Sequence, residues 1–115
     1  MFAGHKKMNT LCVLVDNNGI SQMGKINDIC SPEPLRAKLE SFNFEVLQVD
    51  GQNEAEIMSA ITQLGKSEKP LAIVCRTTKG YGVSFMQSTP VWHYRPPAGI
   101  DYENAVKELE AIPTS

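Results

Sequence analysis

Two asparagines and a glycine stand in the segment "VDNNGIS" (residues 15–21), directly after the most apolar run of the chain, "TLCVLV". Amide oxygens and backbone carbonyls are hard ligands that suit Mg²⁺, which in proteins commonly takes one or two carboxylates and leaves its other positions to phosphate and water. Asn18 and a nearby carbonyl would supply part of such a shell. The alternative is a plain turn, because Asn-Gly pairs tolerate positive φ and most of them bind nothing.

The second candidate for chemistry is His93. It lies in residues 78–99, "TKGYGVSFMQSTPVWHYRPPAG", which show neither helical nor strand periodicity and contain the only Trp of the chain. A loop this long in a small protein is more often functional, or in contact with a partner, than idle. The alternative is that Trp92 and Tyr94, which flank the histidine, simply pin the loop to the surface.

These candidates follow segments that alternate between strand and helix patterns. Residues 10–16 are continuously apolar, as is typical of a strand buried on both faces, and end at Asp16. Ser31 and Asn53 are predicted N-caps of two helices. The predicted elements, in chain order, are strand 10–16, helix 31–43, strand 44–51, helix 53–67, strand 70–77 and helix 101–112.

This alternation implies parallel βαβ units with right-handed crossovers. The segments after parallel strands emerge at one edge of the sheet, the carboxyl edge, where open α/β sheets bind ligands. Three glycine-containing loops, "DNNGISQMG", "DGQN" and "TKGYGVS", should meet there. A turn after a buried parallel strand is not a tight hairpin, which favours the interpretation of residues 15–21 as a ligand site. Neither usual phosphate loop is present, since the chain has no GxxxxGK[ST] motif and "KGYGVS" does not fit GxGxxG.

The composition excludes several classes of partner. The chain has 115 residues, with 42% hydrophobic and 21% charged residues, as is ordinary for one small globular domain. A net charge of -2 argues against nucleic acid or an anionic membrane, because both need a basic field. Cys12, Cys30 and Cys75 have no ligand spacing and indicate small buried hydrophobes in a reducing compartment. With no signal-peptide core and no spanning segment, the sequence favours a cytoplasmic protein.

Four segments in this order, "LCVLVDNNGIS", "VLQVDGQN", "PLAIVCRTTKGYGVSFM" and "VWHYRPP", resemble the later part of the thiamine-diphosphate-binding domain of transketolases, particularly the split type encoded as two subunits. The resemblance runs from about residue 8 to residue 97. It implies an α/β fold, a partial Rossmann-like, three-layer domain around a short parallel sheet. Residues 1–115 would form a single partial domain, the second half of the family's, with a long functional loop at 78–99.

The resemblance also implies a cofactor site. Asn18 would give its side-chain oxygen, and Ile20 its backbone carbonyl, to a Mg²⁺ ion that bridges the diphosphate of thiamine diphosphate, with Gly19 in the same cofactor-binding turn. His93 resembles the histidine that reaches the diphosphate and the reacting centre, so it would be the catalytic residue. The implied enzyme transfers a two-carbon ketol unit from a ketose or ketose phosphate donor to an aldehyde acceptor.

Several positions depart from the family pattern. Tyr94 stands where a glycine usually follows the histidine, Gln52 and Asn53 where histidine and aspartate are common, and Tyr81 where a lysine is frequent. The Gly-Asp-Gly segment whose aspartate binds the metal is not found before Asp16, and the pyrimidine-binding domain is not found either. The resemblance therefore implies companion subunits that carry both. The alternative is a noncatalytic remnant that acts as a binding or scaffolding module.

Overall fold

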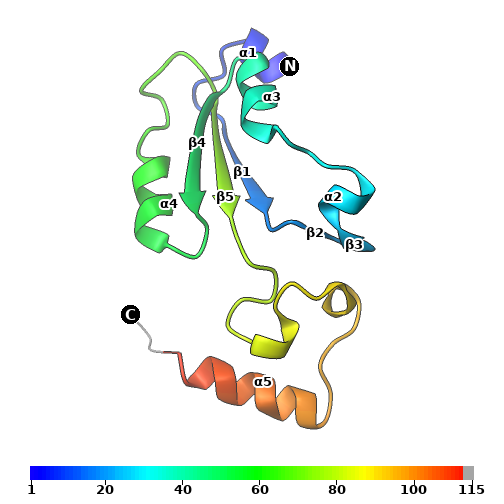
Figure 1. Ribbon diagram of the computed structural model, residues 1–115. Coiled ribbons are helices and arrows are strands. Elements are labelled where there is room, and N and C mark those ends of the chain that lie inside the picture. Colours follow the sequence, from blue (N-terminus) through cyan, green and yellow to red (C-terminus); the bar gives the residue numbers. More distant parts are fainter. Residues whose placement is uncertain (113–115) are drawn as a thin grey trace. The chain divides into compact units, whose positions relative to one another are not determined.

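The computed structural model describes residues 1–112, and Figure 1 shows their helices and strands. This part of the chain divides into two compact units. We call Met1–Asn17 and Pro32–Thr77 the sheet unit, and residues 18–31 and 78–112 the loop unit. No helix in residues 1–112 is both long enough and apolar enough to cross a membrane.

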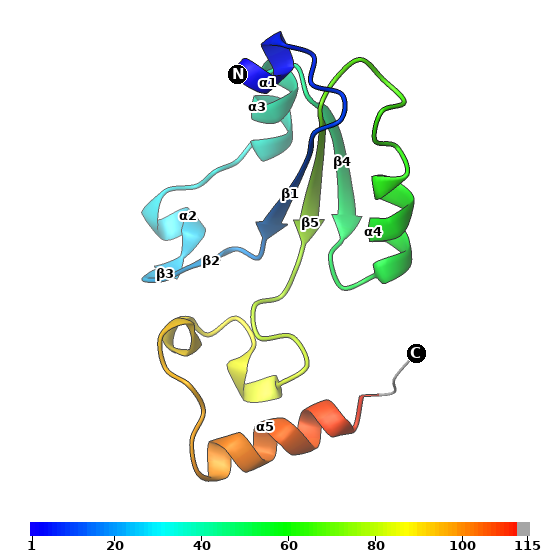
Figure 2. The same ribbon diagram turned by 180° about the vertical axis from the view of Figure 1, so that it is seen from behind.

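Three parallel strands form the sheet unit's centre (Figure 2). They are β1 (Cys12–Asn17), β4 (Glu45–Asp50) and β5 (Leu71–Arg76), in the order β1-β5-β4. Asn17 and Asp50 both lie opposite Arg76, so the three strands end level with one another. The predicted strands and their parallel arrangement are confirmed, and the segments that follow them leave from the carboxyl edge.

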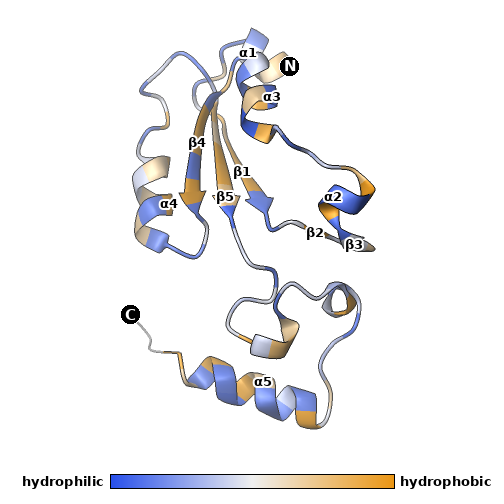
Figure 3. Cartoon of the chain, viewed as in Figure 1, coloured by the Kyte–Doolittle hydropathy of each residue, from blue (hydrophilic) through white to orange (hydrophobic). Residues whose placement is uncertain are grey.

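The prediction that residues 10–16 form a strand buried on both faces is wrong. β1 is an edge strand, and its Leu14 side chain is 58% exposed. The strand buried on both faces is β5, where Leu71 is 1% exposed and Ile73 is fully buried. An apolar run predicts a strand, but it does not tell which strand lies between two other strands of the sheet. Figure 3 shows that all three strands are rich in apolar residues.

Alternate residues of β5 face two apolar clusters. Ala72 and Val74 pack with Leu35 and Leu39 of α3 (Leu35–Ser41) and with Ala3 of α1 (Phe2–His5). On the other face, the cluster is built by Leu71, Ile73, Cys75 and, from α4 (Glu54–Ile61), Ala60 and Ile61. The sheet is thus covered by helices on both sides, and the predicted three-layer α/β arrangement is confirmed.

One of the two predicted helix caps is confirmed. Asn53 caps α4, because its side-chain oxygen accepts a hydrogen bond from the Glu56 N–H at 3.2 Å. The prediction of Ser31 as the cap of the helix at 31–43 is wrong. The α3 helix begins only at Leu35, whose N–H donates to the Glu33 carboxylate at 2.9 Å. The Ser31 hydroxyl instead donates to the Asn27 side chain at 2.9 Å.

The loop unit has little regular structure apart from its last helix. The predicted helix at 101–112 is confirmed as α5, and the segment at 78–99 contains two short 3-10 helices. A two-stranded hairpin and a one-turn helix follow β1 and were not predicted, since elements of two to four residues carry no periodicity. The elements of the loop unit are β2 (Ile20–Ser21), β3 (Gly24–Lys25), α2 (Ile26–Ile29), η1 (Ser84–Met86), η2 (Pro90–His93) and α5 (Ile100–Glu110).

The three cysteines have different environments. Cys75 is buried and Cys12 is partly buried, and burial raises the pKa of both thiols. Both therefore stay neutral and behave as small hydrophobes, as predicted. Cys30 is exposed, so the prediction of a buried thiol is wrong there. It follows the one-turn helix α2, which has no buried residue.

Candidate functional site

The turn after β1 is closed by its own asparagine. The Asn18 Oδ1 atom accepts a hydrogen bond from the Ile20 N–H at 2.9 Å. Gly19 has a φ of 72°, a left-handed conformation that glycine adopts without steric cost. The Gly19 carbonyl accepts the N–H of Ile26 at 2.9 Å. Asn18, Gly19 and Ile20 thus lie in one ordered Asx turn.

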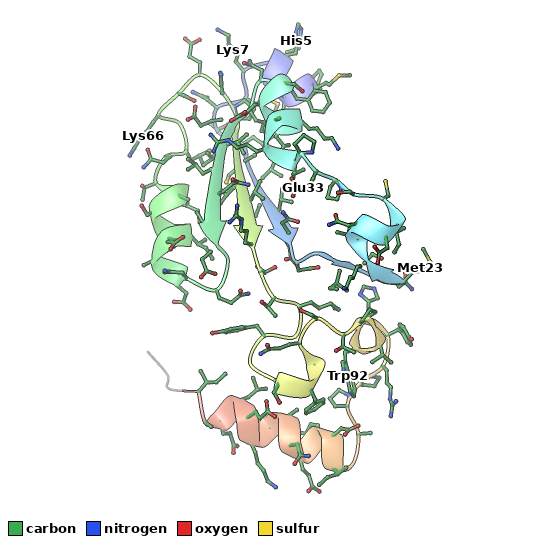
Figure 4. All side chains as sticks on the ribbon, viewed as in Figure 1. His5, Lys7, Met23, Glu33, Lys66 and Trp92 are labelled. Atoms are coloured by element: carbon green, nitrogen blue, oxygen red, sulfur yellow. The ribbon has the colours of Figure 1, made fainter. Side chains whose placement is uncertain are left out.

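The short hairpin after this turn holds Ile20 in place. Ile20 of β2 pairs with Lys25 of β3 in an antiparallel arrangement. The Met23 N–H, at the hairpin tip labelled in Figure 4, donates to the Ser21 hydroxyl at 3.2 Å. Hydrogen bonds and strand pairing therefore hold the backbone on both sides of the Ile20 carbonyl.

Polar side chains also organise the strand ends of the sheet unit. The Thr77 hydroxyl donates a short hydrogen bond to the Asp16 carboxylate, which joins the ends of β1 and β5. The Asp50 carboxylate accepts the N–H of Gln52 at 2.9 Å. Asp50 therefore shapes the turn after β4, as its place between a strand and a glycine suggests.

His93 is the last residue of η2, and its side chain is exposed. Its neighbour Trp92, labelled in Figure 4, donates from Nε1 to the Phe85 carbonyl at 3.2 Å and packs edge-on against the Phe85 ring, with 5.5 Å between centroids. The Arg95 guanidinium lies 5.6 Å from the Trp92 ring centroid. Trp92 thus pins the loop, while Tyr94 is 68% exposed. This arrangement fixes the backbone beside His93 and leaves its imidazole accessible.

The loop that carries His93 is also tied to α5. Both the backbone N–H and the hydroxyl of Ser84 donate to the Glu108 carboxylate, the hydroxyl at 2.8 Å. These two bonds lower the pKa of Glu108, so its carboxylate is ionised at neutral pH. An apolar pocket of about 320 Å³ is lined by this loop and by α5, with residues that include Tyr81, Met86, Tyr102 and Leu109.

The donor set of the Asx turn fits part of a magnesium shell. An amide oxygen has two lone pairs, so an oxygen that accepts one N–H can also face a cation. Together with the carbonyl of Ile20 it would offer two hard oxygen donors, to which Mg²⁺ adds phosphate and water oxygens. Residues 1–112 contain no cluster of three or more His, Cys, Asp or Glu side chains that could hold a metal ion. The Asx turn by itself would give a Mg²⁺–diphosphate group two oxygen donors.

The chain is similar to components of split transketolases. It is 32% identical over 108 residues to one of the subunits of the apulose-4-phosphate transketolase of Actinobacillus succinogenes, covering 94% of this chain and 39% of that relative. It is 34% identical over 111 residues to the 6-deoxy-6-sulfo-D-fructose transketolase subunit SqwG of a Clostridium species, covering 96% of this chain and 40% of that relative. The chain thus spans about two fifths of the length of these curated relatives.

The fold comparison agrees with the sequence comparison. The transketolase from Campylobacter jejuni superimposes with a TM-score of 0.87 at 28% identity, over 95% of this chain and 17% of that one. The transketolase from Leishmania mexicana gives a TM-score of 0.85 at 28% identity, over 95% of this chain and 16% of that one. Residues 1–109 match the family described as transketolase, thiamine diphosphate binding domain. The chain therefore belongs to the family of transketolase thiamine-diphosphate-binding domains.

Proposed function

We propose that this chain is a subunit or fragment of a split, cytoplasmic transketolase-like enzyme. The enzyme transfers a two-carbon ketol unit from a ketose or ketose phosphate to an aldehyde acceptor. The observation that carries the proposal is the ordered turn of Asn18, Gly19 and Ile20 after the first parallel strand, in a chain that matches this family over residues 1–109.

In this proposal the chain supplies part of the Mg²⁺–diphosphate site. Asn18 would give its side-chain oxygen and Ile20 its backbone carbonyl to the metal ion, while Gly19 would let the backbone approach the diphosphate closely. When bound, thiamine diphosphate would supply a carbon nucleophile for the ketose carbonyl. His93, exposed at the end of η2, would stabilise charge or move a proton at the diphosphate and the reacting carbonyl.

We further propose that companion subunits complete the site. Magnesium in proteins usually takes at least one carboxylate, which the Asx turn does not offer. The companions would carry that carboxylate, in a Gly-Asp-Gly segment, and the pyrimidine-binding domain. The names of the two split-type relatives, which describe each as a transketolase subunit, support the existence of companion subunits.

The sheet offers a surface for such a companion. The Leu71 N–H donates to the Leu11 carbonyl, so the peptide groups of Leu11 face β5. Because these groups alternate in direction along a strand, those of Cys12 and Leu14 face away from β5. On the other edge strand, β4, the outward N–H of Asp50 is taken by the Glu56 side chain at 2.9 Å. An edge with outward peptide groups and an exposed apolar side chain favours pairing with a further strand. We therefore assign the β1 edge to the companion.

The proposal is tested by calorimetric titration of thiamine diphosphate and Mg²⁺ into the chain by itself and into mixtures with transketolase-like subunits encoded beside it. We expect binding in a mixture, and we expect Asn18→Ala to weaken it at least about tenfold through loss of a metal ligand. The matched control is Asn104→Ala, an exposed asparagine on α5. Circular dichroism verifies that both variants are folded. Absence of binding in every mixture by a folded chain would refute the enzyme-subunit proposal and favour a noncatalytic binding or scaffolding module.

A further inference from the structure

The Glu33 carboxylate joins the end of β1 to the start of α3. Its Oε1 atom accepts a hydrogen bond from the Asn17 side-chain amide at 3.2 Å, and its Oε2 atom accepts the Leu35 N–H at 2.9 Å. Asn17 is the last residue of β1 and Leu35 the first of α3. Figure 4 labels Glu33 in the segment that leads into α3. The Glu33 side chain thus holds both the first N–H of α3 and the side-chain amide of Asn17, the residue just before the Asx turn.

The surroundings of Glu33 hold its carboxylate in place and ionised. The Lys38 ammonium donates to the carbonyls of Pro32 at 2.7 Å and Glu33 at 3.1 Å, which fixes the backbone before α3. The Leu35 N–H and the Asn17 amide lower the pKa of Glu33, and the charges of Lys38 and Arg76 act in the same direction. The bond from Asn17 is therefore charge-assisted, which makes it stronger than a bond between neutral groups.

We propose that Glu33 is a positioning residue for the turn that carries Asn18, Gly19 and Ile20, and that it acts through Asn17. Asn17 directly precedes Asn18, so restraint of its side chain restrains the backbone that enters the turn. A turn that is already ordered loses less conformational freedom when a ligand binds. The effect on diphosphate binding rests on the proposed function, whereas the ordering of the turn rests on the geometry.

A charge swap between the two side chains tests the proposal. Asn17→Asp places a second carboxylate against Glu33 and replaces the hydrogen bond by repulsion. Adding Glu33→Gln to that variant restores the bond, because the new amide donates to the new carboxylate while its oxygen still accepts the Leu35 N–H. The control is Glu40→Gln on α3, which removes an exposed ion pair with Arg36 and leaves Asn17 untouched.

The measurement is amide hydrogen exchange at Ile20, whose N–H is bonded to Asn18 in the turn. We expect Asn17→Asp to speed this exchange about three- to tenfold, the double variant to return it to the wild-type rate, and Glu40→Gln to leave it unchanged. Circular dichroism and the melting temperature check that global stability is the same in all variants. Unchanged Ile20 exchange in folded Asn17→Asp, or no recovery in the double variant, would overturn the proposal.

A second readout separates this proposal from the proposed function. In a complex that binds Mg²⁺ and thiamine diphosphate, the dissociation constant of thiamine diphosphate should follow the Ile20 exchange rate. It should rise in Asn17→Asp and return to the wild-type value in the double variant. Exchange that responds while the dissociation constant stays constant would support Glu33 as the residue that orders the turn. The same result would overturn the placement of the diphosphate site at Asn18 and Ile20.

Discussion

At the residue scale, the carboxyl end of β4 leaves no room for a side chain after Asp50. The Gly51 N–H donates to the Arg76 carbonyl at 2.7 Å, which draws its backbone against β5. A Cβ atom at this position would overlap the Thr77 methyl group and would lie 3.0 Å from the Cys75 Cβ atom. Gly51 is not among the glycines with positive φ, so it is required for space and not for its backbone conformation.

We expect Gly51→Ala to lower the free energy of unfolding by about 1–3 kcal/mol, the usual cost of forcing a methyl group into a packed site. Urea denaturation of the wild type and the variant measures the difference. Thr77→Ser removes the overlapping methyl group but keeps the hydroxyl that donates to Asp16. The double variant should therefore lose less stability than the sum of the two single variants. Strict additivity would contradict the steric explanation.

At the element scale, α5 is held to the η1 segment by a group that titrates. Ser84 donates to the Glu108 carboxylate from both its backbone and its hydroxyl, and these bonds lower the pKa of Glu108. A lowered pKa in the folded state means that protonation opposes folding. The stabilisation from Glu108 is therefore fully present above the ordinary pKa of glutamate, and it is lost as the pH falls through the lowered pKa.

We expect wild-type chain to melt at a higher temperature than Glu108→Gln at pH 7, and the difference to shrink as the pH falls toward 3. Thermal unfolding followed by circular dichroism across this pH range gives both melting temperatures. The control is Glu103→Gln, an exposed glutamate on the same helix. A difference between wild type and Glu108→Gln that stayed constant with pH would show that protonation of Glu108 does not govern the attachment of α5.

The same elements show what the sequence predicts and what it does not. The strands that end at Asp50 and Arg76 and the cap at Asn53 follow from local patterns, and the structure confirms them. The edge position of β1 depends on strand order, which no local pattern encodes. The α3 helix starts later than its pattern predicts because the Glu33 carboxylate, and not a serine, accepts the first helical N–H. A glutamate two residues before an apolar helical pattern is the available signal for that residue.

The site shows the same division between local and distant information. The grouping of Asn18 and Ile20 in one turn could be predicted, because Asn-Gly pairs favour turns. An asparagine side chain also accepts the N–H two residues later, as Asn18 does from Ile20. Their roles as ligands of a metal remain predictions. The hydrogen bond between Glu33 and Asn17 spans 16 residues, and the bond between Thr77 and Asp16 spans 61. Contacts of that separation follow from the packed fold and could not be inferred from the sequence pattern.

At the scale of the whole molecule, the chain covers about two fifths of its split-type relatives, and β1 is one of the two edge strands of its sheet. Leu14 lies on that edge with 58% of its surface exposed. An edge strand with unpaired outward peptide groups and an exposed apolar side chain tends to associate with another chain. If a companion strand pairs with β1, both the peptide groups and Leu14 become covered in the complex.

We therefore expect Leu14→Lys to leave the fold of the isolated chain intact and to weaken its binding to the companion by about tenfold or more, because a charge would be buried at the new strand pair. Met58→Lys is the matched control, since Met58 is 61% exposed on α4 and away from the β1 edge. Calorimetry measures both affinities, and circular dichroism checks the folding of each variant. Equal affinity of wild type and Leu14→Lys would place the companion elsewhere on the chain, and a loss shared by Met58→Lys would show that the added charge acts without regard to position.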